Sequence, residues 1–368
     1  MHNNPGRPRK EEHRTGSHIG RRLRESLERA GAVVVAEREP AAAARPFGAA
    51  WVDVREFHEA QRLKQDLLRR YRGRSLEEVL PGEEVRTARG VCYRLVSRDA
   101  GRLRTADPDA VRRSLLADLK LLYGVGAVTE AALKRQGVAT IADLADHPRF
   151  GRQAREILRM VETKDTAELT NWISRWFSRS HPLFLLSSGF HREEDFVLID
   201  IETLGMFQRP IILLGLAQVR GSGIRVDQYL LRRIDEEPAA LAGLLDHLGG
   251  PRAFVTFNGR TFDLPYIRER LAYYGIRADL GGPHFDVLHF SRRAWRDCVP
   301  DCRLTTLERC FLGIEREDDV PSALVPEFYE SYMRTGNPGP LVPIVEHNRR
   351  DLLTLASLFS KLHEEWRP

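Results

Sequence analysis

From residue 194 onward, apolar and polar positions alternate between strand-like and helix-like patterns. Short apolar runs bounded by turn residues predict buried strands, and apolar residues spaced three and four apart predict helices. Glycines at 221 and 223 indicate a hairpin between two of the strands. The predicted strands are residues 196–201, 211–219, 224–231, 253–257 and 285–288, and the predicted helices are residues 238–248, 264–274, 304–311, 326–334 and 341–363. Antiparallel strands followed by a β-α-β unit and more helices predict an α/β fold whose mixed sheet is flanked by helices.

The first half of the chain has a different texture, with longer helical patterns and few strand signals. A charged helix is predicted near residues 54–71, one or two short strands around residues 90–96, and mostly helix over residues 107–177, which includes a helix near residues 137–144. We therefore expect a smaller, mainly helical domain over residues 51–185 and a separate α/β domain over residues 190–368. Residues 1–50 are basic and rich in Gly, Pro and Ala, and we expect a disordered tail there, with at most a short strand at residues 33–35.

Charge is divided unevenly between the two halves. The chain carries +5 overall, with +10 on residues 1–190 and −5 on residues 191–368. A basic half joined to an acidic half suits a polyanion-binding region joined to a carboxylate-rich site. No apolar run reaches the roughly 18 residues of a membrane helix, and the N-terminus lacks a secretory signal, so we expect no membrane association and a cytoplasmic location.

Four cysteines are too few for a disulfide framework. Cys298, Cys302 and Cys310 lie close together in the sequence, but a metal site there would need a fourth ligand. We interpret them as reduced, partly buried thiols rather than as metal ligands.

Two acidic residues end the first apolar strand of the second half. Because a strand alternates its faces, Asp200 and Glu202 point the same way. Adjacent carboxylates repel each other unless a cation lies between them, and a hard ion such as Mg²⁺ or Mn²⁺ suits such a pair. The alternative is a solvated strand end that happens to be acidic.

Further candidate side chains follow later elements. Asp263 stands at the start of a predicted helix, where it could be a metal ligand or simply an N-cap. His347 and Asp351 are four apart on the last helix and share one face, as a catalytic pair or as an exposed pair would. Asn258 could contact a nucleotide or form a turn. We interpret Asp286 as a structural or supporting carboxylate, and Tyr266 could contact a nucleotide or lie in the core.

The order and spacing of these residues are similar to those of known motifs. One residue separates Asp200 from Glu202, four separate Asn258 from Asp263, and three separate His347 from Asp351. This series resembles the three exonuclease motifs of the DEDD superfamily, and the stretch from residue 196 to the end looks like its YprB-type, ribonuclease-H-like branch, which includes the mitomycin repair factor B exonucleases. Supporting stretches are residues 285–293, 304–308, 312–316 and 326–332.

The resemblance implies a role for each acid. Asp200 would bridge two Mg²⁺ or Mn²⁺ ions, Glu202 and Asp351 would complete the ion that holds the attacking water, and Asp263 would hold the second ion. His347 would take the proton from that water, as a neutral imidazole near pH 7 can. The expected reaction is 3′→5′ hydrolysis to nucleoside monophosphates. One departure concerns His347, which stands four residues before the last aspartate where the His-containing subgroup has five.

In the basic half, Gly124 and Gly126 lie between two predicted helices and resemble a helix-hairpin-helix motif spanning residues 115–147. In such motifs backbone N–H groups and the following helix N-terminus hold a phosphate, and Lys134 and Arg135 could add contacts. The packing positions would be Leu133, Ile141 and Leu144. The alternative is an ordinary helical hairpin that needs Gly for its turn.

These observations favour a metal-dependent 3′→5′ exonuclease that acts on DNA in repair or processing, because helix-hairpin-helix motifs are commoner on DNA. The alternatives are an RNA-directed nuclease, including an endonuclease of RNA in hybrids, and a catalytically weak DNA-binding adaptor for a helicase. A helicase partner is expected only from the resemblance.

Overall fold

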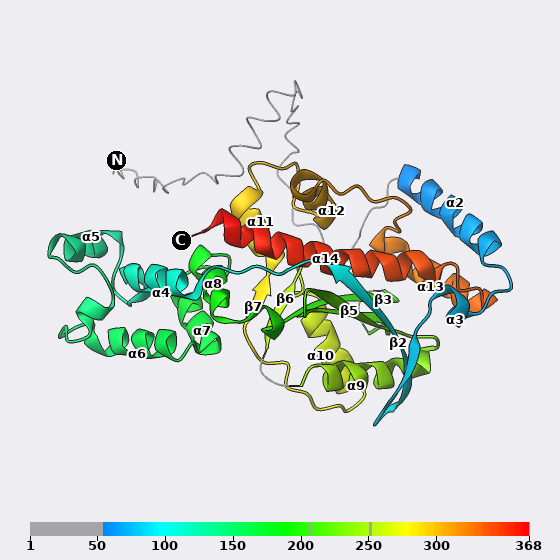
Figure 1. The fold of residues 1–368 in the computed structure, drawn as a ribbon, viewed down its shortest axis with the longest axis horizontal. Coiled ribbons are helices and arrows are strands. Elements are labelled where there is room, and N and C mark those ends of the chain that lie inside the picture. Colours follow the sequence, from blue (N-terminus) through cyan, green and yellow to red (C-terminus); the bar gives the residue numbers. More distant parts are fainter. Residues whose placement is uncertain (1–53, 206–207, 250–251, 368) are drawn as a thin grey trace, which may run out of the picture.

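The computed structural model describes residues 54–205, 208–249 and 252–367 (Figure 1). The tail expected over residues 1–50 and the strand considered at residues 33–35 lie outside this part of the chain. Within it, no helix has both the length and the apolar character needed to cross a membrane.

A seven-stranded mixed sheet organises the described residues. Its order is β1 (Glu83–Thr87), β2 (Gly90–Ala100), β5 (Gly223–Leu230), β4 (Ile211–Arg220), β3 (Phe196–Thr203), β6 (Ala253–Thr256) and β7 (His284–Asp286). The pairs from β1 to β3 are antiparallel, and the pairs β3–β6 and β6–β7 are parallel. The predicted α/β class with a mixed, helix-flanked sheet is confirmed.

Helices cover both faces of this sheet (Figure 1). Val197, Ile199 and Ile201 of β3 pack with α9 (Glu237–His247) and α10 (Asp263–Tyr273) on one face. Phe196 and Leu198 pack on the other face with α11 (Val287–Trp295) and α14 (Leu341–Glu365). Because neighbouring side chains of a strand point to opposite faces, the next residues in the second series, at positions 200 and 202, lie on the face that α14 covers.

The sheet contains strands from both sides of the domain boundary expected at residue 185. β2 pairs with β5 from Tyr93–Leu230 to Ala100–Gly223, so residues 83–100 form the sheet's outer edge. The predicted charged helix is α2 (Val54–Arg70), which packs with α13 (Val325–Thr335) through an ion pair between Lys64 and Glu327, and the short α3 (Leu76–Val79) adds Leu76 to the same core. Such long-range pairing leaves no local signal in the sequence, and the segment was therefore assigned to the wrong region.

A helical region follows the edge strands. It contains α4 (Pro108–Ala117), α5 (Ala127–Arg135), α6 (Gly151–Glu162), α7 (Thr166–Trp176) and α8 (Pro182–Leu186). The predicted packing positions Leu133, Ile141 and Leu144 are buried. The helix expected over residues 137–144 is only a 3₁₀ turn at Ala142–Leu144, because the Asp143 carboxylate accepts the backbone N–H groups just before it and favours a turn.

Two elements near the site also differ from expectation. The strand expected over residues 285–288 ends at Asp286, whose carboxylate accepts the Leu288 N–H and caps α11. The helix expected over residues 304–311 is α12 (Leu304–Leu307) followed by a π-helical turn at Glu308–Leu312. Such π turns are rare and occur often at functional sites.

His363 anchors the helical region to the last turn of α14. Its Nδ1 accepts the Ala106 N–H at 3.2 Å, so the neutral ring donates from Nε2 to Ser188 Oγ at 2.9 Å. Burial lowers the pKa of His363 to about 3. The ring therefore stays uncharged in the folded protein over the pH range in which it takes up a proton in the unfolded chain.

This histidine predicts acid sensitivity. Between pH 6.5 and pH 3 the unfolded chain binds a proton at residue 363 that the folded protein does not, so stability falls as pH falls through that range, by at most about 1.4 kcal/mol per pH unit. In urea unfolding, the free-energy advantage of the wild type over His363→Gln, which keeps both hydrogen-bonding functions but does not titrate, should shrink by roughly 2 kcal/mol between pH 7.5 and pH 5. An advantage independent of pH would contradict this account of His363.

Candidate active site

The structure brings the five residues expected to be catalytic together around β3. Asp200 and Glu202 come from β3, Asp263 is the first residue of α10, and His347 and Asp351 lie on α14. The pKa of Asp200 is raised well above its ordinary value by burial and by the negative charges of the other acids. That mutual repulsion reflects how closely the carboxylates lie.

Asn348 holds Asp200 and was not singled out from the sequence. Its Nδ2 donates to Asp200 Oδ2 at 2.6 Å and to the Asp200 carbonyl at 3.1 Å, and its Oδ1 accepts from Gln228 Nε2 at 2.8 Å. The amide reaches β3 by crossing β4 at Gly215, which is paired with Asp200. A Cβ at position 215 would stand 2.2 Å from Asn348 Oδ1. Glycine is required there because the asparagine side chain occupies the space.

Asp263 is not a helix cap. The N-cap of α10 is Phe262, with no side-chain capping bond, and Asp263 Oδ1 instead accepts the Ile201 N–H at 3.1 Å. That N–H is available because β6 pairs with β3 only as far as Leu198. The divergence of two parallel strands thus creates the position from which Asp263 reaches the site.

His347 lies between two acids of the site on the buried face of α14. Its Nε2 is 3.7 Å from Asp351 Oδ2 and 3.9 Å from Glu202 Oε1, and its Nδ1 is 2.7 Å from Asp319 Oδ1. The structure therefore excludes an exposed His–Asp pair, because His347 is only 7% exposed.

A cleft of about 560 Å³ opens onto the site. Asp200, Asp351 and Asn258 line it together with two arginines, Arg292 and Arg303. Asn258 has φ +63°, a left-handed conformation that Asn tolerates better than most residues. The acids thus face a solvent-accessible space that also contains positive charge.

Asp286 and Tyr266 hold backbone segments next to the site by hydrogen bonds. The Asp286 carboxylate accepts the N–H groups of Asn258 at 2.8 Å and of Arg260 at 3.1 Å, so it holds the loop that lines the cleft. Tyr266 is buried, and its hydroxyl accepts the Arg209 N–H at 3.1 Å. Asp286 has the supporting position expected of it, and Tyr266 fixes the loop between β3 and β4.

Burial dominates the electrostatics of the acids. It raises the pKa of Glu202 to about 7 and that of Asp263 to about 7, and Asp351 is raised as well. For Asp263, the hydrogen bond from Ile201 lowers the pKa, and the charges of Asp286 and Glu202 raise it further. Carboxyl groups whose pKa values lie near neutral pH have too little positive charge around them to stabilise their ionised form.

The acids around His347 favour a charged ring over the neutral imidazole that the resemblance implies. Burial alone would lower its pKa, but Asp351, the hydrogen bond to Asp319 and Glu202 outweigh burial and raise the pKa to about 10. These contacts favour the protonated ring, whose Nδ1 then donates to Asp319. In this state it has no lone pair with which to accept a proton.

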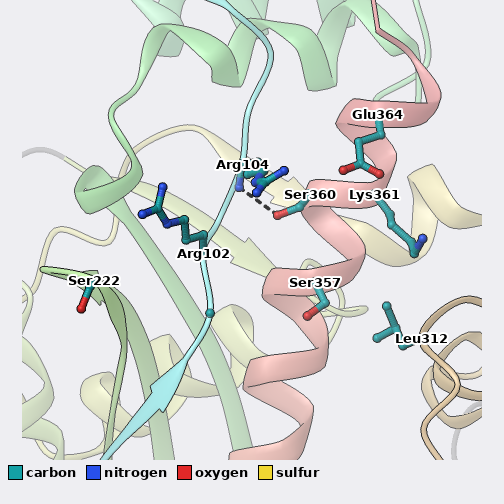
Figure 2. Close-up of a pocket in the computed structure, with 9 residues that line it drawn as sticks. Arg102, Arg104, Ser222, Leu312, Ser357, Ser360, Lys361 and Glu364 are labelled. Carbon is teal, nitrogen blue, oxygen red and sulfur yellow. Dashed lines mark hydrogen bonds between the residues drawn. The ribbon is translucent and has the colours of Figure 1, made fainter.

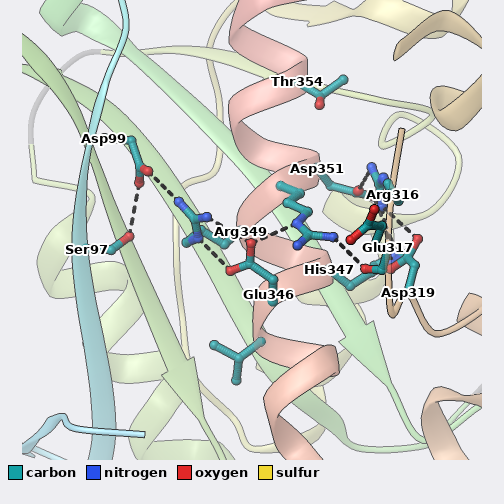
Figure 3. A network of polar contacts seen from close by, with 12 residues as sticks. Ser97, Asp99, Arg316, Glu317, Asp319, Glu346, His347, Arg349, Asp351 and Thr354 are labelled. Atoms are coloured by element: carbon teal, nitrogen blue, oxygen red, sulfur yellow. Dashed lines mark hydrogen bonds and ion pairs between the residues drawn. The ribbon is translucent and has the colours of Figure 1, made fainter. Parts of the chain in front are cut away.

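Arg316 is a second cation of the site, and no sequence pattern singled it out individually (Figure 3). Its guanidinium donates to both Glu308 oxygens at 2.7 Å, lies 3.3 Å from Asp319 Oδ2, and pairs with Asp351 Oδ1. The side chain is 5% exposed. Breaking a buried pair of this kind by removing one partner typically costs about 3–5 kcal/mol.

The donor set fits hard divalent cations by its chemistry. Arg316 and His347 pair with the acids Glu202, Asp351, Asp319 and Glu308, and Asp200 and Asp263 add two further acids to the site. The hydrogen bonds described above occupy one oxygen each of Asp200, Asp263 and Asp351. Carboxylate oxygens in negative excess are the ligands that Mg²⁺ and Mn²⁺ prefer.

The present side-chain arrangement is nevertheless not a closed metal cage. Among the residues the structure describes, no group of three or more His, Cys, Asp or Glu side chains is arranged to hold a metal ion. Two contacts account for this physically, because Arg316 draws Asp351 toward Glu308 and Asn348 draws Asp200 toward β4.

The residues expected to bind nucleic acid lie in the helical region. Gly124 has φ +84°, and Gly126 is the N-cap of α5, where no side chain makes a capping bond. Lys134 forms an ion pair with Glu130 at 2.9 Å, and the Arg135 guanidinium donates to the Ala131 carbonyl. Phosphate binding by these residues stays a prediction.

The cysteines and a second cavity complete the surroundings of α14. Cys302 lines the site cleft, and burial raises the pKa of its thiol, as expected for a reduced, partly buried cysteine. A cavity of about 400 Å³ lies where residues 101–104 cross α14, with Ser360 Oγ accepting the Arg104 N–H (Figure 2). The expected catalytic acids do not line this cavity.

The contact between Gly215 and Asn348 predicts a coupled effect. Gly215→Ala should displace the Asn348 amide from Asp200 and cost roughly 1–3 kcal/mol in urea unfolding. In an Asn348→Ala background the same substitution should cost less, since the atoms it would meet are gone. An equal cost in both backgrounds would contradict the assignment of Gly215 to this contact.

Known proteins resemble the part of the chain that contains the acidic site. Residues 197–363 match the family model of the RNase H superfamily. Over 200 residues the chain is 32% identical to YprB of Bacillus subtilis (strain 168), described as an uncharacterized protein. That alignment covers 52% of this chain and 48% of YprB, so the chain spans about half the length of this relative.

Among solved structures, the family B DNA polymerase from the hyperthermophilic archaeon Pyrobaculum calidifontis aligns with a TM-score of 0.37 at 17% identity. The alignment covers 45% of this chain and 24% of the polymerase. The family match and the identity to YprB agree with the sheet and helices described above. Residues 197–363 are thus similar to the RNase H superfamily, and 200 residues of the chain are similar to YprB.

Proposed function

We propose that this chain is a metal-dependent 3′→5′ exonuclease that hydrolyses phosphodiester bonds of DNA. The match of residues 197–363 to the RNase H superfamily supports a nuclease. The observation that carries the finer proposal is that four acids from three separate elements lie close enough to interact, and that two of them, Asp200 and Asp351, line one cleft. Direction, substrate and metal dependence come from the resemblance of the motifs and belong to the proposal.

Asp200, Glu202, Asp263 and Asp351 would hold divalent cations, Mg²⁺ or Mn²⁺. Bound cations supply the positive charge that activates the attacking water and stabilises the leaving 3′-oxygen. The remaining work falls to the chain itself. Asn348 fixes Asp200, and Asp286 fixes the loop that carries Asn258. Arg292 and Arg303 in the cleft wall can pair with phosphates of the substrate strand.

His347 is proposed to accept the proton of the attacking water. It can do so only when added positive charge among Asp351, Glu202 and Asp319 lowers its pKa from about 10. The hydrogen bond to Asp319 orients the ring with Nε2 toward Glu202 and Asp351. The ring is thus held in position before it is deprotonated.

One observation favours a second candidate, a catalytically weak DNA-binding adaptor. Arg316 occupies an oxygen of Asp351, and the acids do not form a closed cage in the described arrangement. If that arrangement persists with metal present, the chain would bind nucleic acid without cutting it efficiently. A helicase partner is not part of either proposal.

Nuclease assays distinguish these candidates. Labelled single- and double-stranded DNA and RNA are incubated with Mg²⁺, Mn²⁺ or EDTA, and we expect shortening from the 3′ end of DNA that EDTA abolishes. Asp200→Ala and Asp351→Ala should each lower the rate roughly 100-fold or more. Asp235→Ala, which removes an exposed carboxylate away from the site, should leave the rate unchanged.

Circular dichroism checks that the variants are folded. Binding without cleavage in either metal would favour the adaptor. Preferential cleavage of RNA would change the proposed substrate from DNA to RNA. Full activity in Asp351→Ala would remove the site assignment itself.

A further inference from the structure

Two exposed aromatic rings stand together in the helical region, apart from the acidic site. Tyr123 is 64% exposed and Trp176 is 43% exposed, and their ring centroids are 4.9 Å apart at an interplanar angle of 31°. Large aromatic side chains are usually buried, so a paired and exposed set indicates a surface that binds something.

The backbone beneath this pair is fixed. The Tyr123 N–H donates to Gln153 Oε1 of α6 at 2.8 Å, and the indole N–H of Trp172 in α7 donates to the Leu121 carbonyl at 2.9 Å. Tyr123 therefore lies in a turn tied to α6, and Trp176 ends α7, which is tied to the same hairpin. A rigid aromatic platform loses little entropy when a flat partner stacks on it.

Positive charge surrounds the pair. A Cβ at Gly124 would stand 3.1 Å from Arg149 Nη2, which places that guanidinium against the hairpin. Arg175 lies over the Trp172 ring at 5.1 Å. Neither arginine forms an ion pair with a carboxylate within the described residues. Together with the uncapped N-terminus of the nine-residue α5, they favour a polyanion as the partner.

This surface connects to the cleft through α11. Trp176 is two residues before Ser178, whose hydroxyl accepts from Arg293 Nη1 at 3.4 Å. The neighbouring residue on α11, Arg292, lines the cleft that contains Asp200 and Asp351. Two arginines of α11 therefore lie between the segment that follows Trp176 and the cleft that contains the acids.

We infer that an unpaired nucleic-acid strand stacks bases on Tyr123 and Trp176, while Arg149 and the N-terminus of α5 hold its phosphates. Every base has a flat face, so such stacking is tolerant of sequence, and it needs bases that are not paired. The partner is thus a single strand rather than a duplex. That this strand continues over Arg293 and Arg292 with its 3′ end at the acids rests on the proposed function.

Binding measured in EDTA tests the inference without any cleavage. Fluorescence anisotropy would follow 5′-fluorescein oligothymidylates of about 4 and about 16 nucleotides, the range of sites on comparable single-strand binders. Wild type should bind the longer strand more tightly. Tyr123→Ala and Trp176→Ala should each weaken that binding about 10-fold, and Trp176→Phe should keep most of the affinity.

Tyr273 provides a matched control, because it is an equally accessible tyrosine, 71% exposed, on α10. Tyr273→Ala should bind like wild type. Arg149→Ala should reduce the slope of log affinity against log salt by about 0.7, the value for one phosphate contact to a single strand.

Unchanged binding in Tyr123→Ala and Trp176→Ala would overturn the inference, as would equal weakening in Tyr273→Ala or equal competition by blunt duplex DNA. The outcomes for the two proposals are separable. A chain that binds in this way but never cleaves would refute the nuclease and leave the aromatic surface standing. A chain that cleaves but binds without regard to Tyr123 and Trp176 would do the reverse.

Discussion

Repulsion among buried carboxylates is the constraint on which the site depends. Asp200, Glu202 and Asp263 lie where burial alone raises their pKa, and each raises the pKa of its neighbours. A folded chain can keep such a cluster only by supplying positive charge or hydrogen-bond donors to it. Arg316, His347 and the amide of Asn348 fill that role in the described structure. The remaining excess of negative charge is what suits the site to divalent cations.

This constraint also explains details of the fold. Gly215 stands in a central strand, where glycine is usually unfavourable, because the Asn348 side chain must cross β4 to reach Asp200. The π-helical turn after α12 contains Glu308, which together with Asp351 and Asp319 holds the buried Arg316. Local departures from regular structure thus occur where the chain must deliver polar groups to the acids.

Sequence patterns predicted much of this. Alternation along residues 196–201 placed Asp200 and Glu202 on one face, and the spacing of His347 and Asp351 placed both on one side of α14, as the structure has them. What depended on long-range geometry was missed. The pairing of β2 with β5, the reach of Asn348 and the position of Arg316 leave no local signal. The contact between His347 and Asp319 was missed for the same reason, because Asp319 is distant in sequence.

The central claim is that these acids form a cation site, and diffraction from crystals soaked in Mn²⁺ tests it most directly. Anomalous scattering should show manganese between Asp200, Glu202, Asp263 and Asp351, with the Arg316 guanidinium moved away from Asp351 Oδ1. Manganese found only elsewhere on the molecule, with Arg316 still paired to Asp351, would contradict the account.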